Sequence, residues 1–223
     1  MNYVRALLRA SHFPQTVAMI LFLTAAAVIT SAQGSNLALF IAAVLCGQLS
    51  VGWLNDFVDA TLDGSVARSD KPLVAGTLQR SALKVPIAIA MILVVPLSIL
   101  AAGFIGGLAH ILAVASAHLY NLYLSRTIWS WLSYAVSFGL LPLFVAQTSS
   151  TELWPETAMI VLFSLVGVIA HLLNALPDIE LDRKAGKGGL AVSLGRQKSL
   201  LLTAGLSVVS IGVVFYLVFS LQR

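Results

Sequence analysis

Long apolar segments, separated mostly by short polar connections, run through almost the whole chain. A membrane-spanning helix needs about 20 mainly apolar residues, and we identify about seven stretches of that kind. They cover residues 14–32, 36–54, 84–102, 104–123, 128–147, 156–176 and 199–220. This pattern predicts an all-α, polytopic transmembrane helix bundle, in which residues 1–223 form a single domain.

The composition supports a membrane protein. The chain is 59% hydrophobic and 10% charged, whereas a soluble domain carries about 25% charged residues. The net charge of +4 would suit nucleic acid in a soluble protein, but here we expect no nucleic-acid partner. Cys46 is the single cysteine and lies in an apolar run, which excludes a disulfide framework.

The basic residues predict the orientation, because Lys and Arg concentrate in cytoplasmic connections. With the N-terminus in the cytoplasm, every Lys and Arg except Arg223 falls on the cytoplasmic side of the predicted spans. We therefore expect a multi-pass protein of the cell (plasma) membrane. Its two longest connections, residues 55–83 and 177–198, are then both cytoplasmic.

The first of these connections begins with a dense group of oxygen-bearing side chains, which we call the first motif: Asn55, Asp56, Asp59 and Asp63. At about 100° per residue on a helix, these four side chains fall within roughly one 100° arc. Like charges on one helix face repel each other, so a cation is needed to hold them together. Oxygen ligands of this type suit Mg²⁺, and the motif therefore predicts a metal site.

A second motif, formed by Asn174, Asp178 and Asp182, follows the sixth predicted span. The i, i+4, i+8 spacing predicts one shared helix face, with Glu180 pointing to the other side. Pro177 disfavours helix at the residue before it, which leaves open whether Asn174 shares that face. We expect the two motifs to face each other in the folded protein.

Basic residues accompany both motifs: Lys71 follows the first, and Arg183, Lys184 and Lys187 follow the second. Carboxylates with nearby Lys and Arg suit a Mg²⁺-bridged diphosphate, because carboxylates hold the metal and cations hold the remaining oxygens. The alternative for each cation is that it only sets the topology.

Tyr120 and Arg126 close the fourth predicted span, and either could face the same diphosphate. A Tyr at this position can instead be an interfacial anchor. His110, His118 and His171 fall within spans and are predicted to be packed and hydrogen-bonded, and His12 is predicted to be interfacial.

These residues resemble a known family. Residues 55–63 match in full the NDxxDxxxD motif of the UbiA superfamily of intramembrane aromatic prenyltransferases. Four other segments resemble the family more weakly. Lys71-Pro72-Leu73 with Gly76 resembles the RPLxxG stretch, and Asp178–Asp182 resembles the DxxxD motif. Tyr120–Arg126 resembles the Tyr–Lys segment, and Arg9–Pro14 resembles the N-terminal segment. The resemblance covers nearly the whole chain in order, and residues 120–142 resemble actinobacterial members.

The resemblance implies a helical bundle around a central cavity, in which two Asp-rich motifs bind Mg²⁺ and an isoprenyl diphosphate. The allylic cation formed from that diphosphate is attacked by an electron-rich, hydrophobic or aromatic acceptor, as in quinone or related lipid biosynthesis in the membrane.

The residues and the resemblance together give three sets of expected site residues. The expected metal ligands are Asn55, Asp56, Asp59, Asp63, Asp178 and Asp182. The expected catalytic residues are Asp59, Asp63, Asp178 and Asp182. The expected substrate-binding residues are Asn55, Lys71, Tyr120, Arg126, Asn174, Lys187 and Arg9.

The sequence departs from the family pattern in three places. The family usually has about nine spans rather than seven, Ser125 stands where the family has Lys, and residues 186–190 lack the Thr that often follows the second motif. A non-catalytic, chaperone-like membrane protein on the same bundle therefore stays an alternative, as does a polyprenyl-phosphate phosphoribosyltransferase-type relative. A transporter is disfavoured, because its acidic residues would lie near the middle of spans.

The charge bias yields a topology prediction: a cytoplasmic N-terminus and an extracytoplasmic C-terminus. A reporter fused after Arg223 is expected to be active only if it is of a type that works outside the cytoplasm. A cytoplasmic C-terminus would show that one predicted span is wrong. The weakest are 84–102 and 104–123, because almost no connection separates them.

Overall fold

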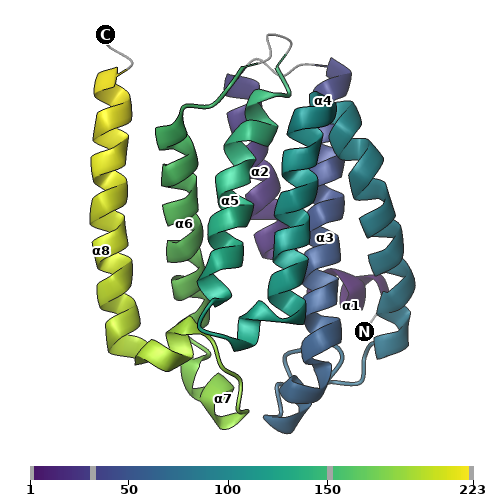
Figure 1. Ribbon diagram of the computed structural model, residues 1–223. Coiled ribbons are helices and arrows are strands. Elements are labelled where there is room, and N and C mark those ends of the chain that lie inside the picture. The colour runs from purple at the N-terminus through teal and green to yellow at the C-terminus, as the bar shows by residue number, and fades with distance from the viewer. Residues whose placement is uncertain (1–2, 31–33, 150–152, 221–223) are drawn as a thin grey trace. The chain divides into compact units, whose positions relative to one another are not determined.

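The computed structural model describes residues 3–30, 34–149 and 153–220, and this part of the chain contains helices and no strand (Figure 1). The α-helices are α1 (Tyr3–Ala10), α2 (Phe13–Ile29), α3 (Gly34–Ser65), α4 (Lys84–Leu122), α5 (Ser130–Ala146), α6 (Thr157–Ala175), α7 (Ile179–Lys184) and α8 (Leu190–Ser220). Two short 3₁₀ helices, η1 (Arg80–Leu83) and η2 (Leu124–Arg126), precede α4 and α5. The predicted all-α class is confirmed.

The chain divides into two compact units, which we describe separately. Unit 1 runs up to Val114 and includes Phe144–Leu153, and unit 2 comprises Ala115–Leu143 and Trp154–Arg223. Unit 1 therefore holds the first motif and unit 2 holds the second. That the two motifs face each other stays a prediction.

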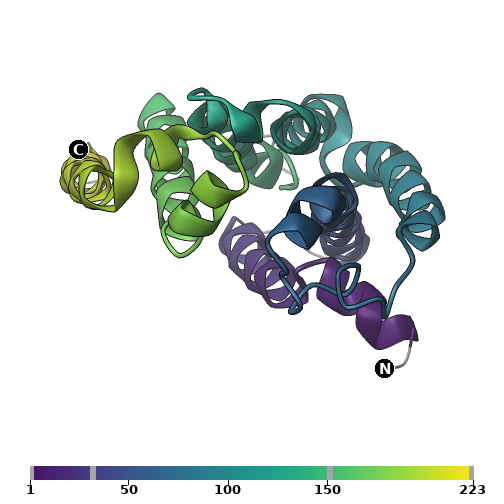
Figure 2. The ribbon, with the colours of Figure 1, turned by 90° about the horizontal axis from the view of Figure 1, so that it is seen from below.

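Not every predicted span qualifies as one by length and composition. Among the described residues four helices qualify, in α3, α4, α6 and α8, and the bent pair of α1 and α2 would make a fifth. The angle within that pair is 63° (Figure 2). Helix α5 is apolar but shorter. The count of about seven spans stays a prediction.

Helix α4 is a hairpin of two helical arms rather than one straight helix. The backbone leaves helical geometry at Ala102 and at Gly103, whose φ of 65° favours glycine. The Ser98 hydroxyl lies 2.7 Å from His110 Nδ1, although these residues would be about 18 Å apart along a continuous helix. The chain therefore reverses at Gly103, at the boundary predicted between the apolar stretches 84–102 and 104–123.

In unit 1 the bend between α1 and α2 packs directly against α3. His12 forms the bend with a left-handed backbone (φ 53°), and the Trp53 indole N–H donates a hydrogen bond of 2.9 Å to the Leu7 carbonyl oxygen. A Cβ on Gly52 would lie 2.3 Å from the Ser11 carbonyl oxygen. Only a residue without a side chain fits there, so Gly52 allows the bend to reach the helix that carries the first motif.

Helix α3 extends beyond its predicted end. The connection predicted at residues 55–83 begins only after Ser65, so the whole first motif is helical. A small core of Ala6, Ala10, Leu78, Leu83 and Ile87 then joins α1 to the end of that connection and to the start of α4.

In unit 2 the sixth apolar segment ends before the second motif is complete. Helix α6 ends at Ala175, and the short helix α7 begins at Ile179. The predicted continuous helix face through Asn174, Asp178 and Asp182 is therefore interrupted. The cause is Pro177, which lacks the N–H that helix continuation requires.

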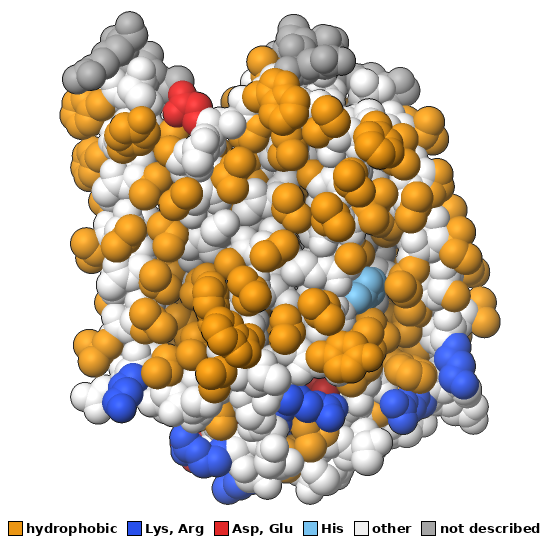
Figure 3. All heavy atoms as spheres, viewed as in Figure 1, with side chains coloured by type: hydrophobic (Ala, Val, Ile, Leu, Met, Phe, Trp, Pro, Cys, Tyr) orange, Lys and Arg blue, Asp and Glu red, His pale blue; other side chains and the backbone are white. Residues whose placement is uncertain are grey.

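The outer surfaces of the helices are strongly apolar. Ile29, Phe104 and Val208 are among many large hydrophobic side chains exposed at the surface, at 82%, 71% and 68% of their area. Hydrophobic side chains cover most of the face seen in Figure 3, and Lys and Arg side chains are few on it. Such surfaces suit lipid contact, as expected for a multi-pass membrane protein.

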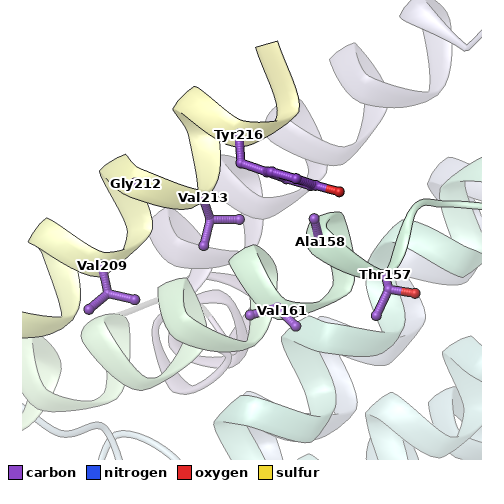
Figure 4. Close-up of a pocket in the computed structure, with 7 residues that line it drawn as sticks. All are labelled: Thr157, Ala158, Val161, Val209, Gly212, Val213 and Tyr216. Atoms are coloured by element: carbon purple, nitrogen blue, oxygen red, sulfur yellow. The ribbon is translucent and has the colours of Figure 1, made fainter. Parts of the chain in front are cut away.

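An apolar cleft of about 540 Å³ opens between α6 and α8 within unit 2 (Figure 4). Its lining residues are Thr157, Ala158, Val161, Val209, Gly212, Val213 and Tyr216. The lining has no charged group that would bind a phosphate. Along α6, the cleft also ends about 20 Å from Asn174, so it is separate from the second motif.

The contact at Gly52 gives a testable prediction. Gly52→Ala would force a Cβ against the backbone of the α1–α2 bend and is expected to destabilise the protein by about 1–3 kcal/mol. Gly64→Ala in the same helix is the matched control, because a Cβ added there would have nothing within 4 Å. It is expected to be neutral or slightly stabilising. Apparent melting temperatures in detergent test the pair, and equal temperatures would contradict the described packing.

Candidate functional site

All four side chains of the first motif lie on the last turns of α3, but they differ in burial. Asp56 is 1% and Asp59 is 5% exposed, and the Asp63 side chain is 13% exposed. Asn55 is half-buried. Burying a carboxylate is costly unless it is paired. The motif therefore requires a cation close by.

Lys71 supplies that cation in the described structure. Its ammonium group forms an ion pair and hydrogen bond with Asp56 Oδ1 and lies 3.9 Å from Asp63 Oδ2. Its side chain is only 13% exposed. A turn after α3 brings Lys71 back to the motif. In this turn the Arg68 N–H donates a hydrogen bond of 3.0 Å to the Asp63 carbonyl oxygen.

His12 reaches the same carboxylate from the bend between α1 and α2. Its Nε2 lies 3.2 Å from Asp56 Oδ1, so the bend contributes a side chain to the first motif. The interpretation of His12 as an interfacial residue did not anticipate this contact. The only signal was its place in the segment Arg9–Pro14, which resembles the family's N-terminal segment.

Arg9 is held near the same region by the loop after α3. Its guanidinium group donates a hydrogen bond of 2.9 Å to the Asp70 carbonyl oxygen. Asp70 directly precedes Lys71, so one short loop segment joins two of the expected substrate-binding residues.

In unit 2 the two aspartates of the second motif are one helical turn apart. The Asp182 N–H donates to the Asp178 carbonyl oxygen at 2.8 Å, and both residues are half-buried. Glu180 instead forms an exposed ion pair with Arg183, with atoms 2.7 Å apart. The predicted separation of Glu180 from this pair agrees with its exposed position.

Asn174 belongs to a different group of side chains at the end of α6. It hydrogen-bonds the side chain of Tyr134, whose electrostatic neighbour is Lys187. The Tyr120 ring meets the Tyr134 ring edge-on, with centroids 5.2 Å apart. The structure thus brings together Tyr120, Asn174 and Lys187, three of the predicted substrate-binding residues, around Tyr134.

Sequence reasoning missed Tyr134, because it lies within an apolar span without a motif of its own. His171 Nε2 lies 2.9 Å from the Ser130 hydroxyl. The prediction that His171 is packed and hydrogen-bonded agrees with this contact.

The Arg126 backbone packs against the segment between α7 and α8. A Cβ on Gly188 would lie 2.1 Å from the Arg126 carbonyl oxygen, so the segment between α7 and α8 packs tightly on η2. The Arg126 residue is exposed. The neighbouring Lys187 N–H donates to the Asp182 carbonyl oxygen at 2.8 Å.

The donor atoms fit Mg²⁺ by their chemistry. Among the described residues, no three His, Cys, Asp or Glu side chains converge on one metal position. Mg²⁺ does not need such a cage, because it binds through one or two carboxylates together with water and phosphate oxygens. Asp56 Oδ2 is buried, and no group in the described part of the chain hydrogen-bonds it. An orphaned carboxylate oxygen of this kind is consistent with an additional cation.

Three comparisons relate this geometry to known proteins. A sequence model of the UbiA prenyltransferase family matches residues 14–222. A UbiA homolog from Archaeoglobus fulgidus bound to DMAPP and Mg²⁺ is similar to this chain, with a TM-score of 0.77 and 17% identity over 94% of this chain and 76% of that chain. A search of curated proteins found no match.

Two further solved structures share the fold. For the same homolog bound to GPP and Mg²⁺, the TM-score is 0.71 and the identity 18%, over 95% of this chain and 77% of that chain. For the apo structure of a UbiA homolog from Aeropyrum pernix K1, the TM-score is 0.69 and the identity 16%, over 96% of this chain and 78% of that chain. The predicted UbiA-like helix bundle is confirmed: this chain belongs to the UbiA prenyltransferase family.

Proposed function

We propose that this protein transfers an isoprenyl group from a prenyl diphosphate to a hydrophobic acceptor in the membrane, with Mg²⁺ as cofactor. The observation that carries the proposal is the buried cluster in unit 1, where Asp56 and Asp63 lie around the Lys71 ammonium group. Carboxylates, which are suited to binding Mg²⁺, and an ammonium group, which is suited to binding phosphate, lie together there. Membership of the family and the homolog bound to DMAPP or GPP with Mg²⁺ support it.

The aspartates would hold the metal. Asp59 and Asp63 on α3 are the proposed ligands in the first motif, with Asn55 and Asp56 beside them. Asp178 and Asp182 are the proposed ligands in the second. When bound by these residues, Mg²⁺ would supply positive charge against the negative charge that grows on a departing diphosphate.

The basic and polar side chains would bind the diphosphate directly. Lys71 and Arg9 lie on or against the loop after α3, and Lys187 lies near Tyr134 in unit 2. Ammonium and guanidinium groups bind phosphate oxygens strongly. Tyr120, Asn174 and Arg126 are proposed to contact the same substrate.

The acceptor would be an electron-rich ring. An allylic cation reacts with water unless water is excluded, and the apolar spans provide a dry environment. An aromatic acceptor of quinone or related lipid biosynthesis meets these conditions. We propose that the protein lies in the cell membrane. The connections 55–83 and 177–198 and the N-terminus would then be on the cytoplasmic side.

The role of the first motif can be tested by removing single ligands. Asp59→Ala and Asp63→Ala are expected to abolish Mg²⁺-dependent turnover while leaving the protein in the membrane, because the remaining donors cannot hold the metal. The assay supplies membranes with radiolabelled prenyl diphosphates of several lengths, with and without Mg²⁺, and the lipid product is extracted. Glu180→Ala is the control and should keep its activity. Full activity in both variants would show that the metal site does not lie in the first motif.

If both motifs act on one diphosphate, their contributions are not additive. Asp59→Ala and Asp178→Ala should each lose nearly all of the single-turnover rate, and the double variant should lose little more. The comparison uses a prenyl diphosphate that the wild type accepts. Losses that simply multiply, or a silent Asp178→Ala, would show that the second motif does not share the substrate.

A further inference from the structure

Lys71 occupies a position among the carboxylates of the first motif that a metal ion would also favour. Its ammonium group is bonded to Asp56 Oδ1 and lies 3.9 Å from Asp63 Oδ2. The negative charges of Asp59 and Asp56 both act on Asp63 as well. Lys71 therefore lies beside two of these carboxylates, and the positive charge of Arg68 also acts on Asp63. Asp56, which is 1% exposed, keeps one buried oxygen that no described group hydrogen-bonds.

This arrangement sets up a competition between two cations. An ammonium group a few ångströms from a bound Mg²⁺ repels it strongly, because the surroundings are largely buried and screen charge poorly. Asp56 Oδ1 and Asp63 Oδ2 can therefore contact the Lys71 ammonium group or a metal ion, but not both at the same time. A bound diphosphate offers the ammonium group other oxygens to bind.

The loop geometry allows the Lys71 side chain to move by itself. The backbone around Lys71 is fixed by its own hydrogen bonds: the Ala75 N–H donates to the Lys71 carbonyl oxygen at 2.9 Å, and the Thr77 N–H donates to the Pro72 carbonyl oxygen at 3.0 Å. The four-carbon stem of lysine is flexible. A change of side-chain rotamer would carry the ammonium group away from Asp56 while the loop stays folded.

We propose that Lys71 is an internal counter-cation that makes metal loading depend on the substrate. In the metal-free protein it neutralises the first motif and competes with Mg²⁺ for Asp56 and Asp63. When a diphosphate and Mg²⁺ bind together, the ammonium group leaves the carboxylates for the phosphate oxygens. This inference rests on the proposed function, because it assumes that the first motif binds Mg²⁺.

The first test uses the wild-type protein and measures how fast each lysine is acetylated by acetic anhydride, read out by mass spectrometry. Lys84, at the start of α4, is the internal reference. Metal-free protein should show slow labelling of Lys71, Mg²⁺ alone should raise the ratio of Lys71 to Lys84 labelling, and added inorganic diphosphate should lower it again. A ratio that stays constant at either step overturns the proposal.

The second test separates the charge of Lys71 from its contact with Asp56. Lys71→Gln keeps a hydrogen-bond donor and removes the positive charge. With Mn²⁺ as a probe for Mg²⁺, followed by electron paramagnetic resonance, this variant should bind metal about tenfold more tightly in the absence of diphosphate. At saturating Mn²⁺ it should bind inorganic diphosphate about tenfold more weakly.

The opposite signs are the decisive feature, because general damage to the site would weaken both binding steps. Lys84→Gln carries the same change in net charge and should alter neither, and Lys71→Arg should stay close to the wild type. Metal affinity that is unchanged or lower in Lys71→Gln contradicts the competition. If no variant and no wild-type sample binds Mn²⁺, even with diphosphate, the proposed function fails together with the inference.

Discussion

The ion pair between the buried Asp56 carboxylate and Lys71 is the interaction on which the site in unit 1 depends. Breaking such a pair by removing one partner costs about 3–5 kcal/mol, because it leaves an uncompensated buried charge. Asp56 lies on α3, Lys71 on the loop after it, and His12 at the α1–α2 bend. One carboxylate thus joins three segments, and Gly52 allows the bend to come close enough for this.

The features that were predicted correctly follow from local patterns. The apolar stretches predicted the helices, because membrane spans need long runs of apolar residues. The spacing of residues 55–63 predicted a helical motif, and the limits of the apolar stretches 84–102 and 104–123 predicted the break at Gly103 within α4. Lys71 follows the acidic helix closely in sequence, and the structure places its ammonium group on Asp56. Each of these inferences uses neighbours along the chain.

The features that sequence reasoning missed depend on contacts between distant segments. His12 is 44 positions from Asp56, and Tyr134 meets Asn174 from another helix. No periodicity encodes such pairs. Pro177 indicated a break, but the spacing of the second motif still suggested one helix face. The predicted span ended at residue 54, because a span is recognised by its apolar residues, whereas helix α3 continues through the polar first motif to Ser65.

The central proposal of this account is that the aspartates of both motifs bind divalent metal and the same diphosphate. The most direct measurement is anomalous X-ray scattering from Mn²⁺ in crystals of the protein grown with inorganic diphosphate. The account predicts Mn²⁺ peaks within coordination distance of Asp59 and Asp63 and of Asp178 and Asp182, with diphosphate density between them. Peaks at neither motif, or at only one with the diphosphate elsewhere, would contradict it.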